Sequence, residues 1–580
     1  MRAPILFLAA ILLAFPHLQA QVIPPTSRAR VVIPWNHFHD FAEMTEVLRT
    51  LERASDGWMR LESIGRSVEG RELWLATLAK PGDRSNVTKP AMWIDANIHG
   101  NETQGTEVAL YTLWYLLENR ERLPMVQELL ARSVFFVLPT LNPDGREWWI
   151  HGPNTEHSSR TGKAGTDNDR DGAIDEDGPD DLDGDGSITT MRMRVTRGGT
   201  HIIDPDDERF MKRVKPGTEG THVLLGAEGI DNDGDGAVNE DGPGGYDMNR
   251  NWPSDWQPDW IQGGAGPYPF CWPETEAVGA FLRAHPNIAA LQSYHNNGGM
   301  ILRGPGAESA PAYSASDINV FDALGKAGEK MLPHYRYMII WKDLYTVHGG
   351  SITWAFENLG IFGFTNELWA DGQYGVEFGD REEFRKERTL WDERLELGRN
   401  LRPWKPFTHP VHGPIEVGGF AKTVGRVPPP FMLEELCHRN TAFTLHCAAE
   451  MPRLSFGEVH LERVDGELWK LRAEVRNAGL IPTIADHARR RGVVRPDIAT
   501  VSGALEIVAA GRISGPVHDE KFARQEHRPE RLLLPAGIPS QGRVTLQWFL
   551  KGSAGAAPKG TLRIEALKGG VIEVALPEAR

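Results

Sequence analysis

A short apolar run that ends in polar residues near position 100 constrains the fold of this chain more than any other feature. The run Ala91–Ala96 is typical of a buried strand, and His99 and Glu102 follow it three residues apart. Imidazole nitrogen and carboxylate oxygen suit Zn²⁺, and such a pair needs one further protein ligand and an open position for water. The same spacing also occurs in turns and helix caps, so other segments of the sequence are needed to decide whether these two residues bind a metal.

Further short apolar runs surround this strand. Strands are predicted at 73–78 and 133–139, with a helix at 107–117 between the second and third strands and another within 34–53. This alternation predicts a three-layer α/β/α sandwich with a mixed, largely parallel central sheet. Sheets of this kind bind ligands beyond the carboxyl ends of their strands, which is where His99 stands.

The length of 580 residues allows several domains. We expect one α/β domain, which carries His99 and Glu102, over 21–450, interrupted by an Asp-rich insert at 153–245. From about residue 452 the pattern changes to alternating strands broken by Gly, Pro and Asn, which predicts a C-terminal β-sandwich domain over 451–580.

The N-terminus predicts export. Arg2, the apolar run 5–15 and the small residue Ala20 are typical of a signal peptide spanning residues 1–20, although the bulky Leu18 leaves an uncleaved anchor as the alternative. No later run reaches the roughly 18 to 20 apolar residues that a membrane span needs, so no integral membrane segment is expected after cleavage. The sequence predicts a secreted or periplasmic protein.

Charge and cysteine content narrow the function classes. A net charge of −16 argues against a nucleic-acid partner, which would need clustered basic surface. Three cysteines are too few for a disulfide scaffold. Cys437 and Cys447 could form one local bridge, and such a bridge or plain burial of the two thiols is favoured over a zinc cluster with the neighbouring His438 and His446.

The acidic imbalance is concentrated in the insert, where 151–245 holds 22 Asp and Glu against 10 Lys and Arg. Acidic side chains stand there at alternate positions before a glycine, as at the start of a calcium-binding loop. The three repeats are Asp167, Asp169, Asp171; Asp181, Asp183, Asp185; and Asp231, Asp233, Asp235. The twelfth position of each loop lacks the expected Glu, so Asp175, Asp177 or Glu240 could supply later oxygens. A structural Ca²⁺ role is predicted, with a solvated acidic loop as the alternative.

Several motifs follow His99 and Glu102 in a fixed order. They are Asn142-Pro-Asp-Gly145, Asp247-Met-Asn-Arg-Asn-Trp-Pro253, Ser293-Tyr-His295, Tyr345 with Gly349-Gly-Ser-Ile352, and Phe364-Thr-Asn-Glu-Leu368. In this order the chain resembles the zinc metallocarboxypeptidases, whose familiar members are carboxypeptidase A and the regulatory carboxypeptidases N and E. The resemblance runs from about Ile64 to Leu368.

The resemblance implies a role for each motif residue. His99, Glu102 and His295 would hold one catalytic Zn²⁺, and Glu367 would move protons between water and the leaving amine. Arg250, assisted by Asn249, would bind the free C-terminal carboxylate of a peptide, and Tyr345 would close over it.

Two positions depart from carboxypeptidase A. Asn101 stands where that enzyme has an arginine, so an auxiliary cation near the scissile carbonyl is missing. The arginine that stabilises the oxyanion should follow Gly145 by about a dozen residues, which makes Arg160 the candidate and Arg146 the second choice. Ile352 aligns with the floor of the specificity pocket, and an apolar residue there implies a preference for apolar or aromatic C-terminal residues.

The sequence therefore predicts a secreted zinc metallocarboxypeptidase, stabilised by calcium, whose partners are peptides or proteins with a free C-terminus. One alternative is a peptidase of peptidoglycan stem peptides on the same fold. The other is a catalytically inactive, calcium-dependent binding or adhesion protein.

Overall fold

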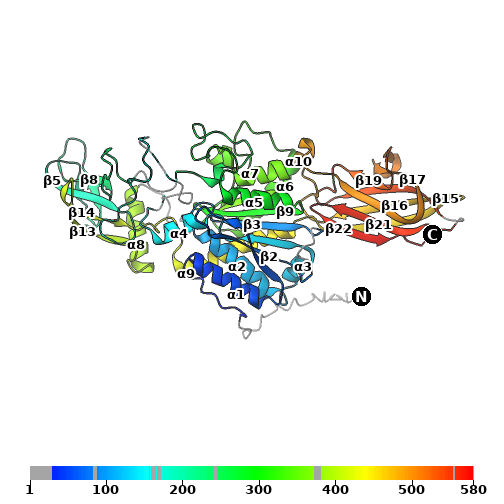
Figure 1. The fold of residues 1–580 in the computed structure, drawn as a ribbon, viewed down its shortest axis with the longest axis horizontal. Coiled ribbons are helices and arrows are strands. Elements are labelled where there is room, and N and C mark those ends of the chain that lie inside the picture. The colour runs from blue at the N-terminus through cyan, green and yellow to red at the C-terminus, as the bar shows by residue number, and fades with distance from the viewer. Residues whose placement is uncertain are drawn as a thin grey trace, which may run out of the picture.

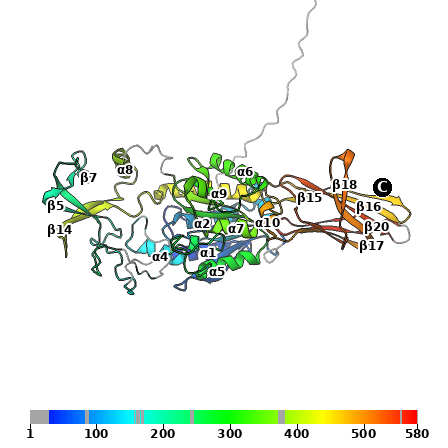
Figure 2. The same cartoon turned by 90° about the horizontal axis from the view of Figure 1, so that it is seen from above.

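The structure is a computed structural model that describes residues 29–82, 88–155, 157, 165, 167, 171–239, 245–370, 381–552 and 556–578. The described parts form an elongated molecule, with a central α/β part between a six-stranded sheet at one end and a C-terminal β domain at the other (Figures 1 and 2). The signal peptide expected at 1–20 lies outside the described residues.

The central sheet has eight strands in the order β1-β2-β4-β3-β9-β12-β10-β11. Its middle strands β4, β3, β9 and β12 run parallel, whereas β1 and β2, β2 and β4, and β12 and β10 pair antiparallel. The mixed α/β prediction is confirmed. The strands are β1 (Met59–Arg66), β2 (Glu72–Leu78), β3 (Ala91–Ala96), β4 (Val134–Leu138), β9 (Ile288–Asn296), β10 (Met300–Arg303), β11 (Arg336–Ile339) and β12 (Phe362–Leu368).

Helices pack against both faces of this sheet. One buried apolar cluster contains residues of α1, α2, α3, α6 and α9, and a second contains residues of α5 and α7. The helices are α1 (Phe41–Ala54), α2 (Gln104–Asn119), α3 (Pro124–Arg132), α4 (Pro143–His151), α5 (Pro273–Ala284), α6 (Ala315–Met331), α7 (Ser351–Leu359), α8 (Arg381–Leu395), α9 (Pro430–Ala449) and α10 (Asp486–Arg491), with short turns η1 (Met248–Arg250), η2 (Ile340–Leu344) and η4 (Val517–Asp519).

Local signals account for the ends of several elements. The helix expected within 34–53 begins only at Phe41, because Asp40 and Glu43 form a reciprocal capping box there. All six residues of β3 are buried, as its continuous apolar run predicts.

Cys437 and Cys447 do not form the predicted bridge. Both lie in α9, about 15 Å apart along the helix axis, which is too far for a disulfide, and both are free thiols.

The six-stranded sheet joins the acidic insert to a later segment. Its order is β13-β14-β5-β8-β6-β7, so β14 pairs with β5 across more than 200 residues of chain, for example Val417 with Met191. The sequence did not predict that residues beyond 400 complete the insert. The strands are β5 (Thr190–Gly199), β6 (His201–Ile203), β7 (Met211–Arg213), β8 (Gly220–Ala227), β13 (Leu401–His409) and β14 (Gly413–Phe420).

The C-terminal domain is built mainly of β-strands, where a β-sandwich was predicted, and it is barrel-like, with the short helix α10 and the turn η4 between strands. The long strand β17 pairs with β21 along its first half and with β20 along its second half, so the antiparallel strands curve around one apolar core. The strands are β15 (Leu454–Asp465), β16 (Leu468–Asn477), β17 (Asp497–Ser514), β18 (Lys521–Arg524), β19 (Arg531–Leu534), β20 (Arg543–Gly552), β21 (Lys559–Ala566) and β22 (Gly570–Ala575).

Specific hydrogen bonds fasten this domain to the central part. Lys568, between β21 and β22, donates from Nζ to the carbonyl oxygen of Ile288 at 2.5 Å. The backbone N–H groups of Asp486 and His487 donate to the Asp317 carboxylate at 3.0 and 2.8 Å. Only 4% of Lys568 is exposed, and burial lowers its pKa to about 7.

Among the described residues, no helix combines the length and apolar composition needed to cross a membrane.

Candidate metal and catalytic site

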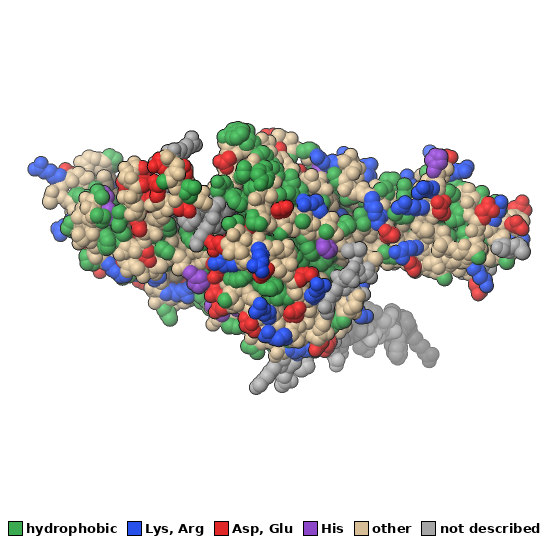
Figure 3. Space-filling model, in the orientation of Figure 1, with side chains coloured by type: hydrophobic (Ala, Val, Ile, Leu, Met, Phe, Trp, Pro, Cys, Tyr) green, Lys and Arg blue, Asp and Glu red, His purple; other side chains and the backbone are tan. Residues whose placement is uncertain are grey.

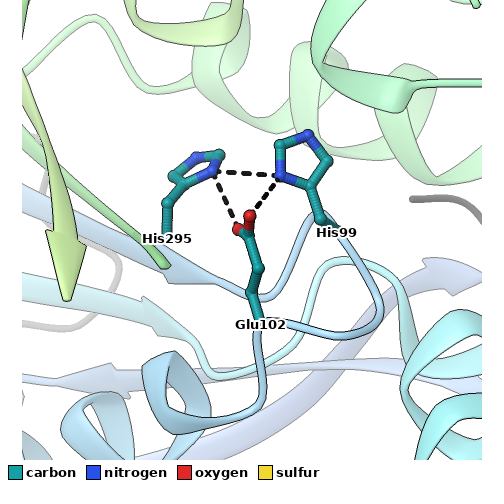
Figure 4. A group of neighbouring side chains, drawn as sticks. All are labelled: His99, Glu102 and His295. Carbon is teal, nitrogen blue, oxygen red and sulfur yellow. Dashed lines mark hydrogen bonds and ion pairs between the residues drawn. The ribbon is translucent and has the colours of Figure 1, made fainter. Parts of the chain in front are cut away.

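Three side chains converge where β3 and β9 end. These strands are parallel neighbours, so their carboxyl ends meet at one edge of the sheet. His99 and Glu102 follow β3 and His295 lies near the end of β9, and Figure 4 shows all three side chains pointing toward one another. Each of the three residues is at most 3% exposed. The topology thus brings together the three predicted ligands.

The distances among these side chains fit a zinc ion. His99 Nδ1 lies 2.9 Å from Glu102 Oε1, and His295 Nδ1 lies 3.0 Å from Glu102 Oε2. The two Nδ1 atoms are 3.3 Å apart. Ligand bonds of about 2.0–2.1 Å at tetrahedral angles separate neighbouring ligand atoms by about 3.3 Å. Two imidazoles and one carboxylate are also the donor types that zinc prefers, so the residues fit the metal.

A second carboxylate orients His99. Its Nε2 contacts Asp247 Oδ1 at 3.0 Å, which leaves Nδ1 as the nitrogen facing Glu102. The same Asp247 oxygen accepts a hydrogen bond from the backbone N–H of Asn249 at 2.8 Å. Asp247 thereby connects the three predicted metal ligands to the turn η1 that carries Arg250.

Glu367 stands on the next strand. β12 runs parallel to β9 with Glu367 in register with His295, so the carboxylate lies beside the three ligands. Burial raises the pKa of Glu367, and repulsion from the neighbouring Glu102 carboxylate adds to the shift. A carboxylate with a raised pKa is suited to taking up and releasing a proton near neutral pH.

A cavity of roughly 240 Å³ contains the ligands and most of the other predicted residues. Arg250 is 7% exposed, whereas Tyr345, which also lines the cavity, is 48% exposed. The predicted residues that line it are His99, Glu102, Asn249, Arg250, His295, Tyr345, Ile352 and Glu367.

Arg250 is held in place by its own turn. Its Nη1 donates to the carbonyl oxygen of Asn249 at 2.9 Å and lies 3.5 Å from Asp247 Oδ2. The Asn249 side-chain oxygen accepts a hydrogen bond from Ser351 N at 2.9 Å, which ties the turn to the start of α7. Both residues therefore face the cavity from a fixed backbone.

Sequence reasoning missed Arg426, which also lines the cavity. Its Nη2 donates to Asn101 Oδ1 at 3.1 Å and to Glu102 Oε1 at 3.2 Å. Its carbonyl oxygen accepts a hydrogen bond from Asn296 Nδ2 at 2.8 Å, next to His295. No motif marks this residue, because it lies in a loop between β14 and α9.

The sequence proposed two arginines, Arg160 and Arg146, as candidates for the residue that stabilises the oxyanion. Arg160 lies outside the described residues. Arg146 is fully buried away from the cavity, where its guanidinium bonds the Glu107 carboxylate and the carbonyl oxygens of His39 and Thr103. Arg146, the second choice for the arginine that stabilises the oxyanion, is therefore not among the residues that line the cavity.

The acidic repeats assemble in part. The structure forms two groups whose carboxylate oxygens lie within 4.8 Å of one another, Asp177 with Asp231 and Asp233, and Asp181 with Asp183 and Glu228. Figure 3 shows acidic side chains gathered beside the six-stranded sheet. In the first repeat Asp169 lies outside the described residues, and neither group includes Asp167, Asp171, Asp185 or Asp235.

Comparison with known proteins places these features in a family. Residues 44–182 and 225–386, together just over half of the chain, match the family model described as zinc carboxypeptidase. Residues 453–577 match a model described as a domain of unknown function. The unmatched stretch 183–224 falls in the insert, and Arg426 lies outside both models.

Among curated proteins, carboxypeptidase A6 of Mus musculus is 24% identical over 352 residues, covering 58% of this chain and 61% of the relative. Human carboxypeptidase Z is 34% identical over 131 residues, covering 22% of this chain and 20% of the relative. The chain thus spans less than two thirds of these relatives. The solved carboxypeptidase A of Helicoverpa armigera is 15% identical, with 73% of this chain and 76% of that chain covered and a TM-score of 0.44. Because the family model matches more than half of the chain, this chain belongs to the zinc carboxypeptidase family.

Proposed function

We propose that the protein is an active metallocarboxypeptidase that releases single residues from the C-terminus of peptides or proteins. One observation carries the proposal: a single cavity holds a two-His-one-Glu ligand set, a half-buried glutamate and a buried arginine. The first two groups supply the means to hydrolyse an amide, and the arginine selects a substrate with a free carboxylate. An inactive binding protein would have no need to keep all of them.

Zinc held by His99, Glu102 and His295 would polarise the scissile carbonyl and make water more acidic. Glu367 would take a proton from the attacking water and deliver it to the nitrogen of the leaving amine, so that the amine departs neutral. Its half-buried position beside Glu102 supports this role, because both features favour the protonated carboxyl group.

Arg250 would bind the C-terminal carboxylate with two parallel hydrogen bonds from its planar guanidinium. Asn249 would assist it, and Tyr345, a half-exposed residue of the cavity lining, would close over the bound residue. This arrangement would place the peptide bond that precedes the C-terminal residue against the metal ligands.

Arg426 would take the place of the arginine that carboxypeptidase A has at the position of Asn101. Its hydrogen bonds to Asn101 and Glu102 put a permanent positive charge on that side of the ligand carboxylate. A cation there would hold Glu102 in orientation and favour the negative charge that develops on the carbonyl oxygen.

The preference would be for apolar or aromatic C-terminal residues. Ile352 lines the cavity, and Glu102 and Glu367 are the acidic residues among its described lining. A basic C-terminal side chain would therefore find no dedicated partner. The other apolar lining residues are Met300, Leu302, Ile340, Leu344 and Val347.

We also propose that the protein is exported, on the strength of the signal-like pattern at residues 1–20. The activity is tested with blocked dipeptides ending in Phe, Leu, Lys or Glu, together with their C-terminal amides, before and after removal and restoration of zinc. Zinc-dependent release from the free acids alone, greatest for Phe and Leu, is expected. Release from none of them would contradict the proposal, and a parallel assay on peptidoglycan stem peptides would then test that alternative.

A further inference from the structure

The two acidic groups of the insert are assembled reciprocally. Asp177 precedes the loop that begins at Asp181, yet it lies with Asp231 and Asp233 of the other loop. Glu228 precedes the loop that begins at Asp231, yet it lies with Asp181 and Asp183. Each loop lacks the acidic residue normally expected at its twelfth position. In place of that residue, each group contains a carboxylate from the segment that precedes the other loop.

Both of these added carboxylates are fully buried. Asp177 is 0% exposed, and although its Oδ1 accepts a hydrogen bond from Asn232 Nδ2 at 3.0 Å, its Oδ2 has no hydrogen-bond partner. Oδ2 of Asp233 is likewise buried without a partner. Within the described part of the chain, no Lys, Arg or His forms an ion pair with Asp177, Asp231 or Asp233. Burying like charges with unpartnered oxygens is costly unless a cation lies among them.

The second group is similar but has a nearby cation. Glu228 is 0% exposed and accepts hydrogen bonds from Thr189 N at 2.6 Å and Leu182 N at 3.3 Å. Burial, with Asp183 and Asp181 adding to it, raises the pKa of Glu228 to about 7. Asp183 pairs through Oδ2 with Lys405 at 2.9 Å, whereas its Oδ1 is buried without a partner.

We propose that the insert binds two Ca²⁺ ions, one held by Asp177, Asp231 and Asp233 and the other by Asp181, Asp183 and Glu228. The ligand atoms are all oxygens, which suits a hard divalent cation and excludes the thiolate or imidazole chemistry of zinc sites. Because each ion would take ligands from both segments, the two ions together would lock 177–186 against 228–236.

The position of the second group gives the ions a structural role. Ser187 follows its loop directly, and Ser187 Oγ accepts a hydrogen bond from Lys422 N at 3.3 Å. Lys422 Nζ donates to the carbonyl oxygens of Trp149 and Gly152 at 2.7 Å each, at the end of α4. The bound insert would therefore support the segment that leads to Arg426. The binding test below does not depend on peptidase activity.

The test is equilibrium dialysis of the full-length, zinc-loaded protein against radioactive Ca²⁺. Two ions per chain are expected, with dissociation constants of about 10⁻⁴ to 10⁻³ M, the range of extracellular calcium modules. Asp177→Asn and Glu228→Gln should each remove one ion. Glu219→Gln, the same type of change at an exposed position of the insert, should keep both.

Double variants test the reciprocal arrangement. Asp177→Asn with Asp231→Asn should still bind one ion, because both changes affect one site, whereas Asp177→Asn with Asp181→Asn should bind none. The opposite pattern would show that Asp177 serves its own loop and would overturn the proposed pairing. A wild-type protein that binds no Ca²⁺ at millimolar concentration, or binds Mg²⁺ equally well, would overturn the calcium assignment.

Thermal unfolding gives a second measurement if a variant folds poorly. Millimolar Ca²⁺ should raise the unfolding temperature of the wild type and of Glu219→Gln, because a ligand that binds only the folded state stabilises it. It should leave Asp177→Asn with Asp181→Asn unchanged. If Asp177→Asn does not fold, Asp233→Asn removes a ligand from the same site. An equal rise in all variants would contradict the assigned residues.

Discussion

Arg426 donates a hydrogen bond to the Glu102 carboxylate at 3.2 Å across 324 residues of chain. Glu102 follows the strand β3, in the part of the chain that the zinc carboxypeptidase model matches, whereas Arg426 lies beyond that part. The site is therefore completed by a loop that the family pattern does not describe. If Arg426 supplies the cation that Asn101 lacks, its removal should affect both metal binding and turnover.

Arg426→Ala should weaken zinc binding by about tenfold or more, because an outer hydrogen bond to a ligand carboxylate is lost. It should also lower kcat/KM by about 10²-fold, the typical effect of losing a donor near the oxyanion. Zinc affinity is measured by competition with a chromophoric chelator, and kcat and KM are measured on a blocked dipeptide.

Arg426→Lys should recover part of the loss, since it keeps the charge but not the planar pair of donors. Arg439→Ala, at an exposed arginine on α9, is the matched control and should leave both values unchanged. Unaltered zinc affinity and unaltered kinetics in Arg426→Ala would remove this arginine from the proposed mechanism.

Glu367→Gln should retain zinc and substrate binding while kcat falls by about 10²- to 10⁴-fold, the usual contribution of a general base. The amide is nearly the same size as the carboxyl group, so the cavity should keep its shape. Zinc content is measured by atomic absorption. A variant that turns over at the wild-type rate would refute the role of Glu367 in proton transfer.

Arg250→Lys tests recognition of the C-terminal carboxylate. The lysine keeps one positive charge but cannot make two parallel hydrogen bonds, so KM for free-acid dipeptides should rise by about tenfold or more. Cleavage of C-terminal amides, which the proposed function expects to be slow, should change little. The ratio of kcat/KM for acid and amide is the measurement, and an unchanged ratio would mean that another group binds the carboxylate.

Ile352→Asp should reverse the preference for the C-terminal residue. A carboxylate in the cavity would be costly without a partner, so kcat/KM for a substrate ending in Phe should fall by about 10²-fold and that for Lys should rise. Ile352→Val keeps the apolar surface and serves as the control. The same ranking of Phe and Lys in the Asp variant would show that the side chain binds elsewhere.

Much of the central fold and of the candidate site could be predicted from the sequence because local patterns carry it. The apolar run of β3 fixes a buried strand, and parallel pairing of β3 with β9 then brings His99 to His295. Arg426 could not be predicted, because a single arginine in an irregular loop has no periodicity and its contact with Glu102 depends on how α9 packs on α2. The pairing of β14 with β5 was also missed, because it joins two strands that lie more than 200 residues apart in the chain and therefore depends on the tertiary fold.

The acidic repeats show what the local spacing of residues can and cannot predict. The spacing of Asp181, Asp183 and Asp185 predicted a loop, and Asp181 does accept hydrogen bonds from the N–H groups of Gly184 and Gly186. Sequence could not show that Glu228 joins this loop, because that contact depends on the tertiary fold of the insert. Local spacing predicted each acidic loop, but the pairing of the two loops could be seen only in the structure.

Lys568 should give the protein a stability that depends on pH. Burial lowers its pKa to about 7, whereas an exposed lysine titrates near 10.4. Between these values the unfolded chain binds more protons than the folded one, so stability should rise with pH from about 7 and level off near 10.4. Below pH 7 the full cost of burying the charge is present. Each pH unit inside the window contributes at most about 1.4 kcal/mol.

Lys568→Met removes this group but keeps a long apolar side chain. Urea unfolding of the full-length protein at pH 7 and pH 9.5 should show the wild type gaining up to about 3 kcal/mol relative to the variant. The comparison cancels other groups that titrate in the same range. Parallel pH profiles for the two proteins would mean that the ammonium stays charged beside the Ile288 carbonyl, and that this contact between the β domain and β9 carries no cost of burial.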